Sequence, residues 1–254
     1  MTRLIALLFA STALVACQTA PVVNSGFLSS YDGLTTKEGT IRASVRERRD
    51  DAAAQGVERV FIEPAGLQPG AATGLSETDV AMVLGEVDRQ ICYEVSERFT
   101  VLPGADRQAA RVRTAVIGVN GTGQAGSAAS AVANFFIPGP IGVRAPGTTG
   151  GLAVETELVA PDGRQVAALA WARNANVVGM DSPSLSRVGD ALQMAEPMGD
   201  AVGDAFAPED RKVRPIADPD PCARFGPRIR PAGFLAGMAT GLYVPELSAS
   251  KPKE

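Results

Sequence analysis

The chain has 254 residues, with 24 Lys or Arg against 28 Asp or Glu and a net charge of −4. This length suits one sizeable core with extensions, and the acidic balance without a basic patch argues against nucleic acid as a partner. Histidine is absent, which removes Ser-His-Asp and Cys-His catalysis as well as histidine metal sites.

The amino terminus reads as a bacterial secretion signal. Residues 1–3 are basic overall, residues 4–14 form an apolar run, and small residues lead to Cys17. The run is shorter than the ~20 residues with which a helix crosses a bilayer. Residues 14–17, Leu-Val-Ala-Cys, resemble the lipobox of bacterial lipoproteins. We therefore expect residues 1–16 to be a cleaved signal peptide and Cys17 to carry the lipid; an ordinary secretory signal with a chance cysteine is the alternative.

Several acyl chains on one residue give a stable membrane anchor, so the expected partner at this end is a membrane. Known lipoprotein sorting retains proteins at the inner membrane through aspartate after the lipidated cysteine, and Gln18 stands there instead. We expect the protein to be lipid-anchored at the outer membrane and to face the periplasm.

Residues 17–56 predict a lipid-anchored tether that leads into an ordered entry segment. The entry segment contains residues 26–34, Gly-Phe-Leu-Ser-Ser-Tyr-Asp-Gly-Leu, and the charged residues 42–51 follow. Residues 57–63 are apolar-rich and end at a proline, which predicts the first core strand.

A long helix is predicted to begin at Ser76 and to run to about Phe99. Ser76 can cap it, with Asp79 three residues on. Apolar residues at three- and four-residue steps give one face that packs on a sheet: Val80, Leu84, Val87, Ile91 and Val95.

The middle of the chain predicts strands around a long loop. Residues 99–102 and the alternating residues 110–119 are expected strands. Residues 118–151 are rich in glycine, alanine and serine, and we expect a long inserted loop with a short helix. Residues 151–159 and 164–174 then form the clearest hairpin, with Trp171 anchoring its packing.

A second helix is predicted to open at Ser182-Pro183-Ser184. Leu185, Val188 and Leu192 give it an apolar face before Pro197 interrupts, and it resumes towards Phe206. Prolines are dense from position 208, which predicts an extended tail rather than a second core.

This order predicts an α+β fold, an antiparallel sheet with two helices packed on one face, a long Gly-rich loop and a Pro-rich C-terminal tail. The expected division is a single α+β domain at residues 57–207 and a C-terminal extension at residues 208–254. The hairpin disfavours a parallel doubly wound sheet.

Two cysteines remain beside Cys17. In an oxidising compartment Cys92 and Cys222 can form a disulfide, which would close a loop of roughly 130 residues and contribute on the order of 4–5 kcal/mol. A buried free thiol at Cys92 with an unrelated Cys222 is the alternative.

Residues 26–34 resemble the opening motif of a bacterial lipoprotein family known as domain of unknown function 3313. The strand at residues 57–63, the long helix, the glycine-rich middle and the hairpin follow in that family's order, so the resemblance covers about residues 25–206. It implies an envelope lipoprotein and transfers no catalytic residue. The tail after Pro208 departs from the family.

Residues 121–126, Gly-Thr-Gly-Gln-Ala-Gly, match a dinucleotide-binding pattern. That pattern needs an acidic residue about 20 positions further on, whereas the next acidic residue is Glu155. We interpret the motif as a flexible glycine loop and expect no nucleotide, no other cofactor and no metal.

Glu155 and Glu157 lie on one side of an expected strand, where paired carboxylates can share a proton or hold a cation. Alternation with Leu152, Val154 and Leu158, which face the core, instead predicts a water-facing strand surface.

Residues 29–32, Ser-Ser-Tyr-Asp, could form a nucleophile cluster, but no histidine and no Ser-x-x-Lys motif supplies a base. We expect Phe27, Leu28 and Tyr31 to dock the entry segment on the domain, while the serines and Asp32 shape turns.

Gly233, Gly237 and Gly241 repeat every four residues, a spacing that lets helices approach closely. The stretch at residues 232–244 is too short to span a membrane. It is a partner-binding or bilayer-contacting helix, a helix packed on its own domain, or no stable helix.

Two functions agree with these patterns. The first is a non-enzymatic binding or assembly factor whose partner is another envelope protein. The alternative is a hydrolase that uses carboxylates, Glu155 and Glu157, on a cell-wall polymer. We favour the first because the anchor signal is strong and no catalytic constellation is visible.

Overall fold

The computed structural model describes residues 23–38, 40, 43–135 and 142–249. Cys17 and the prolines at positions 138 and 140 therefore lie outside the described residues. Most strands belong to an eight-stranded sheet in the order β1-β2-β9-β8-β6-β3-β5, with β4 paired to β6. The strands are β1 (Thr35–Thr36), β2 (Ser44–Arg49), β3 (Arg59–Ile62), β4 (Gly66–Leu67), β5 (Thr100–Val101), β6 (Ala110–Asn120), β8 (Gly151–Val159) and β9 (Gln165–Asn174). A separate ribbon pairs β7 (Gly142–Val143) with β10 (Val178–Gly179).

The α+β fold class is confirmed, and the sheet is mostly antiparallel. The central strands β2, β9, β8 and β6 pair antiparallel with their neighbours, as the hairpin predicts. The short strands β3, β4 and β5 add parallel pairings with β6 and with each other. β2 was not predicted, because its sequence Ser-Val-Arg-Glu-Arg-Arg carries charges at most positions and only Val45 is buried.

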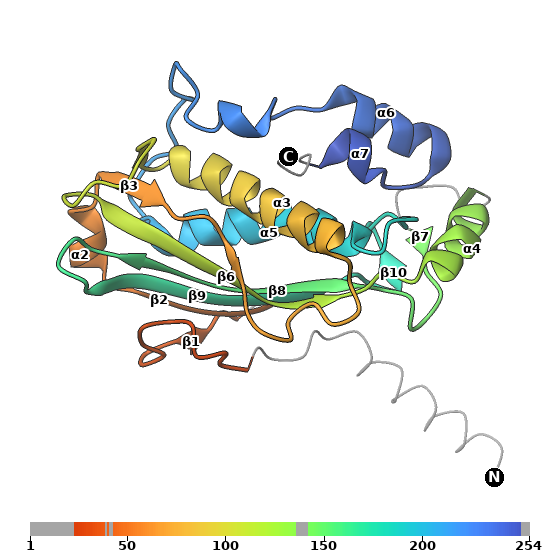
Figure 1. Cartoon of the computed structure of the whole chain (residues 1–254), viewed down its shortest axis with the longest axis horizontal. Helices are drawn as coiled ribbons and strands as arrows, with labels where there is room; N and C mark the ends of the chain where they lie inside the picture. Colours follow the sequence, from red (N-terminus) through yellow and green to blue (C-terminus); the bar gives the residue numbers. More distant parts are fainter. Residues whose placement is uncertain (1–22, 39, 41–42, 136–141, 250–254) are drawn as a thin grey trace, which may run out of the picture.

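Helix α3 (Glu77–Ser96) agrees with the prediction at its start. Ser76 and Asp79 form a capping box in which each side chain accepts from the other's backbone N–H. Val87, Ile91 and Val95 are fully buried, because these positions point into the layer between α3, α5 and the sheet. Figure 1 shows α3 and α5 together on one face of the sheet.

Helix α5 begins later than the sequence predicts, at Gly189, and runs without a break through Pro197 to Phe206. The hydroxyls of Ser184 and Ser186 accept from backbone N–H groups two residues on, which holds this stretch in turns. Leu185, expected on the buried face, is 49% exposed. A serine-rich stretch competes with the helix for its own N–H groups, so the helix starts after it.

The remaining helices lie around this core. They are α2 (Asp51–Gln55), α4 (Gln124–Phe135), a 3-10 turn at Ala223–Phe225, α6 (Pro231–Thr240) and α7 (Pro245–Ser248). The C-terminal residues are thus not extended throughout, and Figure 1 shows α6 and α7 on the outer side of α3. In the part of the chain that the structure describes, no helix combines the length and apolar character needed to cross a bilayer.

Candidate functional site

The face of the sheet that the helices leave open is covered by the entry segment. Figure 1 shows the chain before β2 running along this face. Glu155 and Glu157 of β8 project from it, and both side chains are 0% exposed. The expectation that these glutamates face water is therefore wrong, and they lie instead between the sheet and the entry segment.

Glu155 holds the beginning of the entry segment. The backbone N–H of Ser25 donates to its Oε1 at 3.1 Å and the Ser25 hydroxyl donates to its Oε2 at 2.6 Å. The Tyr31 hydroxyl also donates to Oε2, at 2.6 Å. The same hydroxyl accepts from the backbone N–H of Gly26 at 2.8 Å, so Tyr31 folds the segment back over its own start.

Glu157 holds the next turn of the entry segment. The Ser29 backbone N–H and hydroxyl donate to its Oε2 at 2.9 and 2.5 Å. Gln165 Nε2 donates to the same oxygen at 2.8 Å, and Arg113 donates to Oε1 at 2.5 Å. Both oxygens of a buried carboxylate are therefore satisfied, which a charged group at 0% exposure requires.

Small side chains on the neighbouring strand β9 let the entry segment lie close to the sheet. Across the ladder, Glu155 faces Ala170 and Glu157 faces Ala168, so these residues share the outer face. Both alanines are fully buried. The Phe27 ring lies under the Arg113 guanidinium, 5.2 Å from its carbon, and adds an apolar contact to the polar ones.

The structure joins two groups that the sequence left separate, residues 29–32 and the glutamate pair. Ser30 shapes a turn by accepting from the Asp32 N–H at 3.1 Å. Ser29 binds Glu157 rather than shaping a turn, which corrects that expectation. Sequence reasoning missed Ser25, Arg113 and Gln165. The signal was in β9, where apolar residues on both faces indicate a strand covered on both sides.

This arrangement fastens a segment rather than exposing a reactive group. Hydroxyl, amide and guanidinium donors occupy the carboxylate oxygens of Glu155 and Glu157, and the entry segment lies over them. In the ranges that the structure describes, no cluster of three or more Cys, Asp or Glu side chains is suited to a metal ion. We refer to Glu155, Glu157 and their partners in the entry segment as the carboxylate clamp.

The glycine-rich region is held by a buried ion pair. Arg144 donates to both oxygens of Asp190, at 2.5 and 3.0 Å, and the two side chains are 1% and 0% exposed. Asp190 also accepts from the Gly150 N–H at 2.6 Å, and its own N–H donates to the Thr122 hydroxyl at 3.0 Å. The start of α5 is thereby tied to both ends of the loop.

The glycines of residues 121–126 allow the loop to pack closely. A Cβ at Gly126 would lie 2.2 Å from the Thr148 Cγ2, and one at Gly123 would lie 2.8 Å from the Thr148 Cβ. These approaches are closer than carbon atoms tolerate, so side chains are excluded at both positions. The interpretation as a flexible loop is wrong for this part, because the glycines serve close packing.

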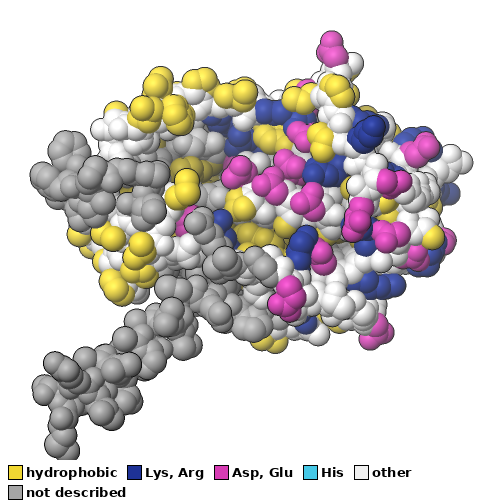
Figure 2. Space-filling model, turned by 180° about the vertical axis from the view of Figure 1, so that it is seen from behind, with side chains coloured by type: hydrophobic (Ala, Val, Ile, Leu, Met, Phe, Trp, Pro, Cys, Tyr) yellow, Lys and Arg dark blue, Asp and Glu magenta, His cyan; other side chains and the backbone are white. Residues whose placement is uncertain are grey.

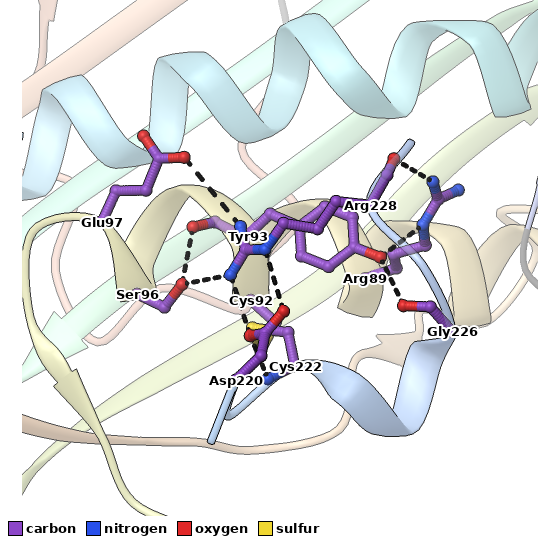
Figure 3. Close-up of a disulfide and its surroundings, with 9 residues drawn as sticks. All are labelled: Arg89, Cys92, Tyr93, Ser96, Glu97, Asp220, Cys222, Gly226 and Arg228. Carbon is purple, nitrogen blue, oxygen red and sulfur yellow. Dashed lines mark hydrogen bonds and ion pairs between the residues drawn. A yellow bond between two sulfur atoms is a disulfide. The ribbon is translucent and has the colours of Figure 1, made fainter. Parts of the chain in front are cut away.

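The C-terminal extension is fixed to α3 by a disulfide. Cys92 and Cys222 are bonded, with their Cα atoms 5.9 Å apart, and both residues are fully buried. Figure 3 shows Arg228 beside this bond, where it reaches back over α3. Its guanidinium donates to both oxygens of Asp220 at 3.0 Å and to the Ser96 hydroxyl at 2.9 Å.

Aromatic and arginine side chains extend this attachment. The guanidinium carbon of Arg228 lies 4.4 Å from the centre of the Tyr93 ring, and the Tyr93 hydroxyl donates to the Gly226 carbonyl at 3.3 Å. Arg89, 4% exposed, donates to Glu86 and to the Ser248 carbonyl. The extension is therefore attached along the C-terminal half of α3.

Of the glycines spaced by four residues, Gly233 serves close packing and Gly241 ends the helix. A Cβ at Gly233 would lie 2.3 Å from the Ser248 hydroxyl oxygen and 2.9 Å from the Leu247 carbonyl, so this glycine lets α6 contact α7. Gly241 ends α6 in the left-handed region, at φ 67°. Of the interpretations that the sequence left open, Gly233 supports local packing, which here is on α7 of the same extension rather than on the sheet domain.

These features define a class of protein: a single α+β sheet domain with an amino-terminal segment clamped to one face and a disulfide-fixed extension over the helices on the other. The chain belongs to the family described as "Protein of unknown function (DUF3313)", whose model matches residues 23–202. The match ends before the C-terminal extension, as the resemblance implies.

Comparison with solved structures gives distant similarities. A PelC dodecamer from Paraburkholderia phytofirmans aligns with 11% identity and a TM-score of 0.39, over 65% of this chain and 96% of that chain. A point variant of the same protein aligns with 11% identity and a TM-score of 0.38, over 66% and 99%. No curated protein matches the sequence.

Proposed function

We propose that this chain is a lipid-anchored envelope protein at the periplasmic side of the outer membrane, and that it binds another envelope protein rather than catalysing a reaction. The sequence support is the signal peptide with Cys17 at its end. The observation that carries the proposal is the carboxylate clamp. The clamp fastens the domain to the segment that directly follows the expected anchor. Glu155 and Glu157 bind that segment, so they are not available to act on a substrate.

The clamp limits how far the domain can lie from the membrane. Ser25, which Glu155 binds, is eight residues after Cys17. A fully extended chain of that length spans at most about 29 Å. A domain held so close to a bilayer is suited to presenting its other surfaces to a partner at a fixed distance from the membrane.

The alternative of a hydrolase acting on a cell-wall polymer is not favoured by this geometry. Such an enzyme needs one carboxyl group to reach the scissile bond and a second one to assist it. Glu155 and Glu157 are 0% exposed and are covered by the entry segment. We therefore assign them an attachment role.

The anchor is tested by mass spectrometry of the protein purified from membranes. We expect the chain to begin at Cys17 with diacylglycerol and amide-linked acyl groups, and to co-sediment with outer-membrane vesicles. A Cys17→Ser variant should lose both the lipid and the sedimentation. Retention of residues 1–16, or an unmodified thiol at position 17, would contradict the proposal.

The binding role is tested by crosslinking in cells followed by affinity capture. The lipidated wild type should return one reproducible envelope protein. A Glu155→Ala, Glu157→Ala double variant keeps Cys17 but loosens the clamp, and we expect it to recover less of that partner. A Glu209→Ala variant, altered at an exposed position, is the matched control. Recovery of the chain alone from the wild type would contradict a binding role.

A further inference from the structure

A cavity of about 730 Å³ lies between α3 and the C-terminal extension. The small residues Ala81 and Gly85 of α3 form one side of the cavity. Phe225, Ile229 and Leu247 of the extension form the other side. Its lining is mainly apolar. The volume falls within the ~300–1,000 Å³ typical of small-molecule sites, which are apolar with a few polar groups.

The walls of this cavity are held in place by the extension's own contacts. The Phe225 carbonyl accepts from Arg230 at 2.9 Å, and the Ala249 carbonyl accepts from the same guanidinium. The disulfide at Cys222 fixes the chain three residues before Phe225. The cavity is therefore formed without a ligand, and binding costs little ordering of the protein.

The charged groups at the cavity favour an anion. Arg224 lines it and is exposed, with its guanidinium carbon 4.7 Å from the centre of the Phe225 ring. In the described part of the chain no acidic side chain pairs with Arg224. Residues 222–245 contain arginines and no acidic residue. Asp88 also lines the cavity, where it accepts from the Ala65 N–H at 2.8 Å.

Ile229, Pro231 and Ala232 line the cavity, and the last two begin helix α6, which carries further exposed apolar side chains. Ile229 is 80% exposed, and Phe234, Leu235 and Met238 of α6 are 69%, 61% and 72% exposed. Figure 2 shows hydrophobic side chains gathered at the edge of the molecule that α6 forms. Burial of an alkyl chain against exposed apolar side chains such as Ile229 is favourable, because both surfaces are removed from water.

We propose that this cavity binds a single-chain amphiphile with an anionic headgroup. The alkyl chain lies among the apolar side chains of α3 and the extension, and the headgroup pairs with Arg224. A neutral apolar ligand would fill the cavity but would make no use of the charge of Arg224. This proposal is independent of the lipid at Cys17 and of the partner that the protein binds.

The experiment uses cis-parinaric acid, an 18-carbon fatty acid whose fluorescence rises in an apolar environment, kept below its micelle concentration. The lipid-free Cys17→Ser protein is titrated at neutral pH with the acid and, separately, with its methyl ester. We expect saturable binding of the acid at one site per chain. We expect the ester to bind at least about fivefold more weakly, because it has no charge for Arg224.

Two variants locate the site. Ala81→Trp fills the cavity from an exposed position of α3, and it should weaken binding of both probes at least about tenfold. Arg224→Glu should weaken binding of the acid by a similar factor and leave the affinity for the ester unchanged. Arg107→Glu, a reversal at an exposed arginine on the chain between β5 and β6, is the matched control and should change neither affinity.

Circular dichroism verifies that each variant is folded. If Ala81→Trp proves unfolded, Ile229→Glu replaces it, because that side chain is 80% exposed and its new charge would repel the acid. Absence of saturable binding by the wild type, equal affinity of wild type and Ala81→Trp, or binding to anionic vesicles without binding of monomeric acid would overturn the proposal.

Discussion

At the scale of single residues, the carboxylate clamp holds the entry segment on the sheet through hydrogen bonds to two buried glutamates. Segments are more commonly held on a sheet by apolar contacts. Glu157 is fully buried and accepts from Ser29, Gln165 and Arg113. Removing one member of such a network leaves donors without acceptors inside the protein, which costs more than the net value of the bonds themselves. The position of the entry segment therefore depends on both glutamates.

A Glu157→Ala variant tests this dependence. We expect the free energy of unfolding, measured in urea, to fall by about 2–3 kcal/mol, because Gln165 and Ser29 lose their acceptor. Limited proteolysis should cut the entry segment before the rest of the domain. Glu209→Ala, at an exposed position, is the control and should change stability by less than about 0.5 kcal/mol. Equal stability of the two variants would show that the clamp is not a stabilising contact.

The glutamates also show where residue-level prediction fails. Alternation along β8 correctly separated Leu152, Val154 and Leu158, which face the core, from Glu155 and Glu157 on the other face. It could not show what covers that other face, because the covering residues precede β8 by more than 100 positions. A charge on the outer face of a strand normally faces water, so the pattern alone gives the wrong environment.

At the scale of elements, β3, β6, β8, β9 and α3 could be predicted because a local signal and a tertiary role agree in each. α3 has both a capping box and a buried stripe, and it begins where the sequence indicates. α5 and β2 lack that agreement. The hydroxyls of the serines at positions 184 and 186 bind backbone N–H groups that a helix would use, so α5 starts late. The composition of β2 does not indicate a strand, and β2 is one because it pairs with β9.

Helix α5 carries acidic side chains at four-residue spacing, Glu196, Asp200 and Asp204, with Glu94 of α3 nearby. Burial, followed by repulsion from Asp200, raises the pKa of Glu196, while Arg173 lowers it less. Burial, then Glu94 and Asp204, raises the pKa of Asp200 against the opposing effect of Arg98. Folded carboxyl groups with raised pKa values bind protons more tightly than unfolded ones, so stability falls as pH rises through this range.

An Asp200→Asn variant should therefore be more stable than the wild type at pH 7. We expect a gain of about 0.5 kcal/mol, the scale of like-charge pairs at this spacing on a helix. The gain should shrink as pH falls towards 4, because the wild-type carboxyls become protonated. Urea unfolding at several pH values measures both effects. A gain independent of pH would show that charge repulsion is not its cause.

The glycine-rich loop offers a steric test at the same scale. Gly126→Ala would place a Cβ 2.2 Å from a carbon of Thr148, and the resulting displacement should cost about 1–3 kcal/mol. Gly104→Ala is a matched control, since a Cβ there meets nothing within 4 Å. Thermal unfolding of the two variants measures the difference. Equal melting temperatures would show that the loop relaxes freely around the added methyl group.

At the scale of the whole molecule, the chain forms layers around one sheet: the entry segment, the sheet, the pair α3 and α5, and the C-terminal extension (Figure 1). The family match covers residues 23–202, which contain the first three layers except the last turn of α5. The fourth layer is attached by Cys222, by Arg228 and by the Tyr93 contact with Gly226. Proline density predicted that residues 208–254 would not form a core, and the possible Cys92–Cys222 disulfide was the one sequence signal that they would lie along α3.

The order of these layers predicts which part of the molecule unfolds first. A Cys92→Ala, Cys222→Ala variant loses a cross-link between residues 130 positions apart, which should lower the free energy of unfolding by about 4–5 kcal/mol, the chain-entropy value for a loop of this length. Because the extension lies outside the sheet and its two main helices, protease should remove it from the variant first and leave a folded fragment that ends near residue 207. Mass spectrometry of the digest identifies the cut, with the disulfide-bonded wild type as control. Simultaneous loss of the whole chain would mean that the extension and the domain unfold as one cooperative unit, because the hydrogen bonds of Arg228 and Arg89 would then couple the outer layer to α3 without the covalent bond.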